Sequence, residues 1–140
     1  MAGKDSDDPT TIRSLAVSPD DVANAYAYTQ ENPGEAVLRV TPPFHGRMRA
    51  RLHVYHRDDT ELTGALHVPP NAVIANDVVA DYPSLEDELE DTDPSATAKI
   101  RKRHADAVEE WQERARESIV DETTLETDEG SHRVEIKRVG

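Results

Sequence analysis

Residues 35–56 read EAVLRVTPPFHGRMRARLHVYH and decide how the middle of the chain folds. Residues 35–41 and 47–56 each alternate between apolar and polar side chains, and the segment Pro42-Pro43-Phe44-His45-Gly46 separates them. Alternation along a run is typical of a half-buried strand, and proline with glycine between two such runs indicates a turn. The stretch therefore predicts a β-hairpin.

More strands are expected after this hairpin. Residues 64–68 form a short alternating run that Pro69-Pro70 ends, because proline cannot donate the backbone hydrogen bond that a strand needs. Residues 123–127 and 132–138 alternate on either side of a polar turn at 128–131. The sequence thus predicts a mostly antiparallel sheet of about five strands, made of a three-strand meander and a C-terminal hairpin.

Two helices are expected as well. Ser18-Pro19-Asp20-Asp21 combines a capping hydroxyl, an early proline and acids near the positive end of the helix dipole, so a helix begins there and ends at Asn32-Pro33-Gly34. A second helix, over 94–119, is expected to begin at Asp93-Pro94 and to bury one stripe of side chains. This stripe is Ile100, His104, Ala107, Val108, Trp111, Ala115 and Ile119. We expect Trp111 in the core and His104 to be a hydrogen-bonded core histidine.

This order of elements fits an α+β fold with the two helices packed on one face of the sheet. The chain has 140 residues, and we expect a flexible N-terminal tail over 1–14 followed by a single domain over 15–140. Within that domain, 71–93 is expected to be a partly ordered acidic connection. The apolar pairs Val73-Ile74 and Val78-Val79 would attach it to the core.

The composition excludes several classes of site and indicates the surroundings in which the protein works. The formal net charge is −13, no cysteine is present, and arginine supplies 12 of the 16 basic residues. Without cysteine, disulfides, thiolate metal sites and cysteine nucleophiles are excluded. No apolar run could span a bilayer and the N-terminus is not a signal peptide, so a cytoplasmic location is expected. Spread carboxylates with arginine in place of lysine are typical of adaptation to high salt.

One surface of the expected sheet carries the opposite charge. Side chains alternate along a strand, so Arg47, Arg49 and Arg51 point away from the apolar side of their strand. The same rule gives an outer face of six basic and two acidic residues, with histidine and tyrosine beside them. They are Arg39, Arg47, Arg49, Arg51, Arg133, Lys137, Glu126, Glu135, His53, Tyr55 and His67.

Three interpretations of this face stay open. The arginine stems could cover an open sheet while their heads reach the protein's own carboxylates. The face could instead dock an acidic protein partner, because guanidinium forks bind carboxylates or phosphates at close range. The third interpretation is a nucleic-acid accessory protein with phosphate contacts from the same arginines and with His53 and Tyr55 near the bases. Two features disfavour binding of nucleic acid: the net charge of the chain is strongly negative, and only one aromatic residue lies among the basic side chains of this face. The candidate binding residues are Arg39, Arg47, Arg49, Arg51, His53, Tyr55, Arg133 and Lys137.

The turn at 42–46 is a second candidate. Either Phe44 closes the end of the sheet in a rigid turn, or Phe44 and His45 form an exposed anchor for a partner. No nucleotide-binding, nucleophile-elbow or calcium-loop motif is present, and no cofactor is expected. The six histidines are scattered, so neither a metal site nor a catalytic residue is assigned. A small enzyme that uses His53, His67 and Tyr55 is the remaining alternative. The sequence does not determine an oligomeric state.

Residues 36–54, AVLRVTPPFHGRMRARLHV, resemble a segment shared by small uncharacterised proteins of halophilic archaea. The resemblance extends more weakly to the helix that contains Trp111 and to the terminal hairpin. It implies adaptation to salt. It transfers no catalytic residue, because no activity is established for that group.

Overall fold

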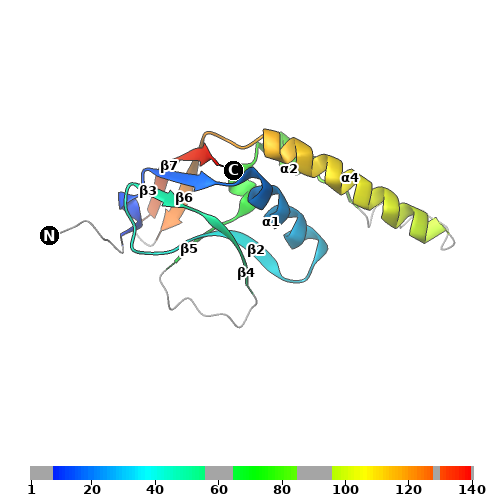
Figure 1. The fold of residues 1–140 in the computed structure, drawn as a ribbon, viewed down its shortest axis with the longest axis horizontal. Helices are drawn as coiled ribbons and strands as arrows, with labels where there is room; N and C mark the ends of the chain where they lie inside the picture. Colours follow the sequence, from blue (N-terminus) through cyan, green and yellow to red (C-terminus); the bar gives the residue numbers. More distant parts are fainter. Residues whose placement is uncertain (1–7, 56–64, 85–95, 128–129, 140) are drawn as a thin grey trace.

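The computed structural model describes residues 8–55, 65–84, 96–127 and 130–139, which form an α+β fold, as predicted. Seven strands make a four-stranded sheet of order β3-β1-β7-β6 and a three-stranded sheet of order β4-β2-β5 (Figure 1). The elements are η1 (Pro9–Thr11), β1 (Ser14–Val17), α1 (Pro19–Glu31), β2 (Glu35–Val40), β3 (Arg47–Arg49), β4 (Arg51–Tyr55), β5 (Leu66–Val68), η2 (Pro70–Val73), α2 (Asn76–Ala80), α4 (Thr97–Glu117), β6 (Glu122–Thr127) and β7 (Gly130–Arg138).

The expected tail over 1–14 is wrong for residues 8–14. Ile12 and Leu15 have no exposed surface, and β1 pairs in parallel with β3 on one side and β7 on the other. This short strand is the centre of the larger sheet, although its partners lie far away along the chain. A run of four residues gives too few alternations for a strand to be recognised locally. Residues 1–7 lie outside the described part.

The arrangement of the strands differs from the expected meander in two ways. The run 47–56 is divided at Ala50 into β3 and β4, and the Ala50 amide donates to the Ala16 carbonyl of β1 at 2.9 Å. β3 therefore joins one sheet and β4 the other. In the smaller sheet β2 lies between β4 and β5, antiparallel to both. The C-terminal hairpin is confirmed as β6 and β7, whose pairing runs from Glu122 opposite Glu135 to Thr127 opposite Gly130.

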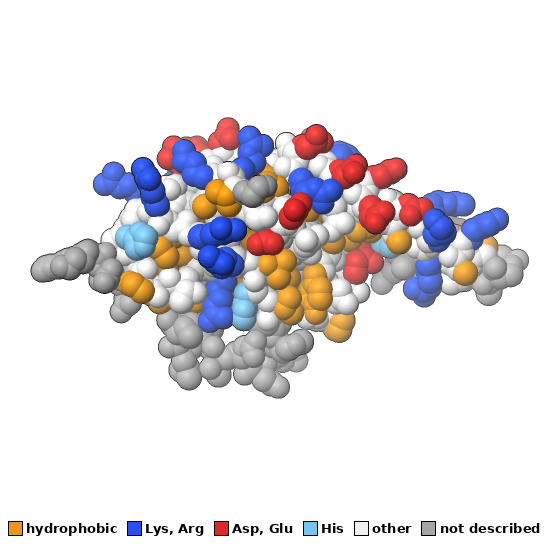
Figure 2. All heavy atoms as spheres, in the orientation of Figure 1, with side chains coloured by type: hydrophobic (Ala, Val, Ile, Leu, Met, Phe, Trp, Pro, Cys, Tyr) orange, Lys and Arg blue, Asp and Glu red, His pale blue; other side chains and the backbone are white. Residues whose placement is uncertain are grey.

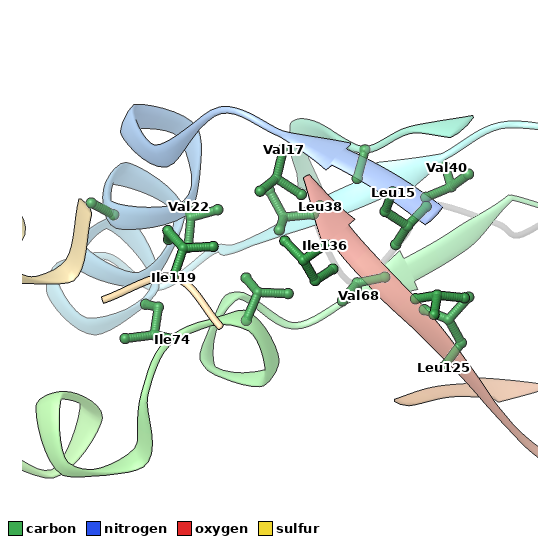
Figure 3. Close-up of a cluster of buried hydrophobic side chains, with 14 of the residues drawn as sticks. Leu15, Val17, Val22, Leu38, Val40, Val68, Ile74, Ile119, Leu125 and Ile136 are labelled. Carbon is green, nitrogen blue, oxygen red and sulfur yellow. The ribbon is translucent and has the colours of Figure 1, made fainter. Parts of the chain in front are cut away.

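The core lies between the two sheets and α1. Figure 3 shows Leu15 and Val17 of β1, Leu38 and Val40 of β2, and Ile136 of β7 pointing toward one another. Val22 of α1, with Ile74 and Ile119, extends this cluster toward the helices. Each large aliphatic side chain buried in this way contributes about 1.5–3 kcal/mol. The core therefore joins both sheets into one unit.

The helices form as predicted, and their packing uses the aromatic residues. Ser18 caps α1, its hydroxyl accepting from the Asp21 amide at 3.4 Å. Figure 1 shows α4 beside α1 at one end and projecting beyond the sheets at the other. Trp111 is 2% exposed and its indole N–H donates to the Val78 carbonyl at 2.7 Å, so its expected place in the core is confirmed. The expected helix start at residues 93–94 lies outside the described residues.

The connection expected over 71–93 contains regular structure in its described part, residues 71–84. η2 and α2 occupy it, and Val73, Ile74 and Val78 are buried, as the two apolar pairs indicated. The Ala75 amide donates to the Ser118 carbonyl, and the Val120 amide donates to the Val73 carbonyl. These backbone hydrogen bonds attach the segment to the chain that follows α4.

Candidate functional site

The arginines of β3 and β4 lie on one side of an extended segment. Arg47, Arg49 and Arg51 are exposed, while Ala50 between them is buried. The alternation continues through the break at Ala50, so the change of sheet does not turn the three side chains away from one another. In Figure 2 a group of Lys and Arg side chains, with a histidine beside it, lies near the middle of the view over this part of the fold.

These arginines surround a hollow of about 440 Å³ at the junction of the two sheets. Its lining comes from β2, from the turn at 42–46 and from β3 and β4. The lining residues are Arg39, Thr41, His45, Arg47, Met48, Arg49, Arg51, Leu52 and His53. Within the described part of the chain, no carboxylate is among these lining residues. The hollow thus brings together four of the predicted arginines, His53 and the predicted loop residue His45.

The register of the smaller sheet explains why Arg39 belongs to this site. Arg39 on β2 lies opposite Arg51 on β4 and opposite His67 on β5. One guanidinium nitrogen of Arg39 is 3.4 Å from Nδ1 and 3.3 Å from Nε2 of His53. The His53 and His67 rings stack with their centroids 5.9 Å apart. These contacts hold the Arg39 side chain, which is partly buried, at one wall of the hollow.

Arg47, Arg49 and Arg51 differ from Arg133 and Lys137 in their contacts with carboxylates. Arg133 lies 2.8 Å from the Glu122 carboxylate and Lys137 lies 3.8 Å from that of Glu135. In the described part of the chain, no carboxylate lies within 4.0 Å of the charged groups of Arg47, Arg49 or Arg51. Within the described residues, the interpretation that the face is covered by the protein's own acids thus fits Arg133 and Lys137 but not Arg47, Arg49 and Arg51.

The other predicted site residues are distributed differently. Phe44 is 1% exposed and lies in the core, so its role as an exposed anchor is wrong and the rigid-turn interpretation fits. His45 beside it is exposed. Tyr55 ends β4, opposite Glu35 of β2. Sequence reasoning missed Thr41, although its spacing of two residues from Arg39 places both on one side of an extended chain.

A second polar cluster joins α1 to α4. The Tyr82 hydroxyl donates to the Glu31 carboxylate at 2.7 Å, and Nε2 of His104 lies 3.1 Å from both carboxylate oxygens. His104 is 5% exposed, so the expected hydrogen-bonded core histidine is confirmed. Burial, and secondarily the hydrogen bond to Glu31 and its charge, raise the pKa of Tyr82 far above its usual value. These hydrogen bonds link the end of α1 to α4 and to the segment after α2, so the role of this cluster is structural.

Within the described residues, no group of three or more His, Asp or Glu side chains is placed to hold a metal ion. Across the same residues, no helix combines the length and the apolar character needed to cross a membrane.

No curated protein and no solved structure matches the chain. The sequence profile of DUF8009, which is described as a domain of unknown function, matches residues 1–140. The chain therefore belongs to the DUF8009 family.

Proposed function

We propose that the chain is a non-catalytic binding module that docks an acidic protein partner through the arginine hollow. One observation carries this proposal. Among the described residues, four guanidinium groups and no carboxylate line a single hollow, on a chain whose formal net charge is −13. Guanidinium forks bind carboxylates in pairs of parallel hydrogen bonds, which makes this lining suited to an anionic side chain.

A protein partner is favoured over nucleic acid by the surroundings of the hollow. Single-stranded nucleic acid is bound on open aromatic faces, on which successive bases stack. Here the His53 ring is in contact with His67 and with Arg39. The phosphate backbone would also approach a strongly negative molecule, and the gain from counterion release is small in concentrated salt.

We also propose that the protein works in the cytoplasm of a halophilic archaeon. The high acidic content, the preference for arginine and the resemblance of residues 36–54 support this proposal. At about 1 M salt the Debye length is about 3 Å, so only direct contacts retain affinity. A hollow lined by several guanidinium groups supplies such contacts. Thermal melting over a KCl series tests the proposal, and greatest stability at low salt would contradict it.

Fluorescence anisotropy tests the binding function. The probe is a labelled glutamate-rich peptide, compared with its glutamine counterpart and with a single-stranded oligonucleotide. The test variant carries Arg47→Ser, Arg49→Ser and Arg51→Ser, and the matched control carries Arg133→Ser and Lys137→Ser on the same face. We expect the glutamate peptide to bind, with affinity reduced at least about tenfold in the test variant and nearly unchanged in the control.

Two results would contradict this reasoning. Equal affinity of the wild type and the triple variant for the glutamate peptide would remove the hollow as the docking site. Tighter binding of the oligonucleotide than of the peptide, at the same KCl concentration, would replace the protein partner with nucleic acid.

A further inference from the structure

We infer that the hollow receives a phosphate monoester, carried by a phosphorylated side chain of the partner. This inference rests on the proposed function, and it names the chemical group that the hollow selects. A partner that presented only Asp and Glu would satisfy the proposed function without satisfying this inference.

Four guanidinium groups reach the hollow from different directions. Arg39 extends from β2, Arg51 from the opposite position on β4, and Arg47 and Arg49 from β3 in the other sheet. One carboxylate has two oxygens and matches one guanidinium fork. A phosphate monoester has three terminal oxygens and about −1.5 to −2 charges near neutral pH, so it can accept from several forks at once. Four arginines around one hollow exceed what a single carboxylate can engage.

The polar side chains of the lining are mostly hydrogen-bond donors. Besides the arginines, the polar side chains are those of Thr41, His45 and His53. A hydroxyl and an imidazole can each donate a hydrogen bond, and none of these side chains is a carboxylate. Among the described lining residues, the arginines, Thr41 and His45 can therefore donate to a ligand, while His53 accepts from the Arg39 guanidinium. A phosphate dianion, which has only acceptors at its terminal oxygens, complements such a lining better than a group that must also donate.

One wall of the hollow is held in place by contacts within the protein. The contacts of Arg39 with His53, and the stacking of His53 on His67, fix part of the lining before any ligand arrives. Ordering a free arginine on binding costs about 0.5–1.5 kcal/mol, and a side chain that is already held avoids much of that cost. The exposed Arg47, Arg49 and Arg51 then close on the anion. A lining with one fixed arginine and three exposed ones suits a compact tetrahedral anion, which needs donors from several sides.

Four labelled peptides, identical except at one central site, test the inference. The site holds Ser, phosphoserine, Glu or two adjacent Glu, and the last of these matches the charge of the phosphate without its geometry. We expect the phosphoserine peptide to bind at least about tenfold more tightly than the two-Glu peptide at about 0.1 M KCl. Inorganic phosphate should displace it.

Matched variants assign the effect to the hollow. Arg51→Gln removes both the charge and the guanidinium fork, and Arg51→Lys keeps the charge alone. Arg133→Gln, on β7 of the other sheet, is the control. We expect phosphoserine affinity to fall at least about tenfold in Arg51→Gln, to fall less in Arg51→Lys, and to change less than about twofold in the control. Urea midpoints confirm that each variant is folded.

The outcomes separate this inference from the function on which it rests. If phosphoserine and two-Glu peptides bind equally and both depend on Arg51, the proposed acidic docking stands and the phosphate inference is overturned. If no anionic peptide binds more tightly than the Ser peptide, both are overturned. If an oligonucleotide binds as tightly as the phosphoserine peptide, phosphodiesters suffice and the commitment to a monoester on a protein is wrong.

Discussion

Arginines without carboxylate partners should repel one another, so removing one of them should stabilise the fold. Arg49 is the best choice because Arg47 and Arg51 lie two residues away on either side, and all three line the same hollow. No described carboxylate lies within 4.0 Å of the Arg49 guanidinium to offset this repulsion. We predict that Arg49→Gln raises the free energy of unfolding at low salt.

The size of the effect follows from the strand geometry. Residues two apart on a strand are separated by about 6.6 Å. Two unit charges at that distance in water repel by about 0.6 kcal/mol. Screening at about 0.1 M salt reduces each term by about half. Two neighbours together therefore give about 0.5 kcal/mol, and at about 1 M KCl, where the Debye length is about 3 Å, almost nothing is left.

Urea denaturation at low and high KCl measures this difference, because urea adds no ionic strength. We expect the midpoint for Arg49→Gln to rise by about 0.3 M at low KCl and to match the wild type at high KCl. Arg133→Gln changes the net charge equally but breaks the 2.8 Å contact with Glu122, so it should leave the midpoint unchanged or lower it slightly. Arg49→Lys keeps the charge and should show no gain. A lower midpoint for Arg49→Gln than for Arg133→Gln would refute the reasoning.

Three further perturbations test the fold. Ile12→Ala should lower the free energy of unfolding by about 2–4 kcal/mol in urea titrations, since Ile12 has no exposed surface; a change below about 0.5 kcal/mol would contradict its place in the core. Trp111→Phe should cost about 1–3 kcal/mol, because the Val78 carbonyl loses the shorter of its two hydrogen bonds, keeps only the one from the Asp81 amide at 3.1 Å, and part of a large buried side chain is removed; a neutral result would contradict this contribution of the indole. The raised pKa of Tyr82 favours the neutral phenol in the folded state, so the stabilising contribution of Tyr82 is complete below about pH 10 and is lost as the pH rises above it. Tyr82→Phe should therefore flatten the fall of the urea midpoint at alkaline pH. An unchanged fall would exclude Tyr82 as the source of the pH dependence.

The parts of the fold that local patterns specify could be predicted. The stripe through Trp111 repeats over many turns, and the Ser18 cap lies within one turn of the helix that it begins, so both helices follow from neighbouring residues. β1 could not be found in this way, because its identity as a central strand comes from pairing with β3 and with β7, more than 100 residues later. Its four residues carry too little periodicity by themselves.

The same distinction holds at the candidate site. Alternation alone predicted that Arg47, Arg49 and Arg51 share a side, because this depends only on an extended backbone. The contact of Arg39 with His53 and the ion pair of Arg133 with Glu122 depend on strand register and on side-chain reach. Phe44 shows the limit most clearly. An aromatic residue in a turn can point inward or outward, and only the packing around it decides.

The division of residues 47–55 at Ala50 has a consequence for how the protein would respond to a ligand. β3 belongs to one sheet and β4 to the other, yet their arginines line one hollow. A chain in which only one sheet had formed would present half of this hollow and would bind an anion poorly. If the proposed ligand binds there, its occupancy would be coupled to folding of the whole domain, and a ligand at one hundred times its Kd would add about 2.7 kcal/mol to global stability. An anion bound in the hollow would contact arginines of both sheets and so link the two sheets to each other.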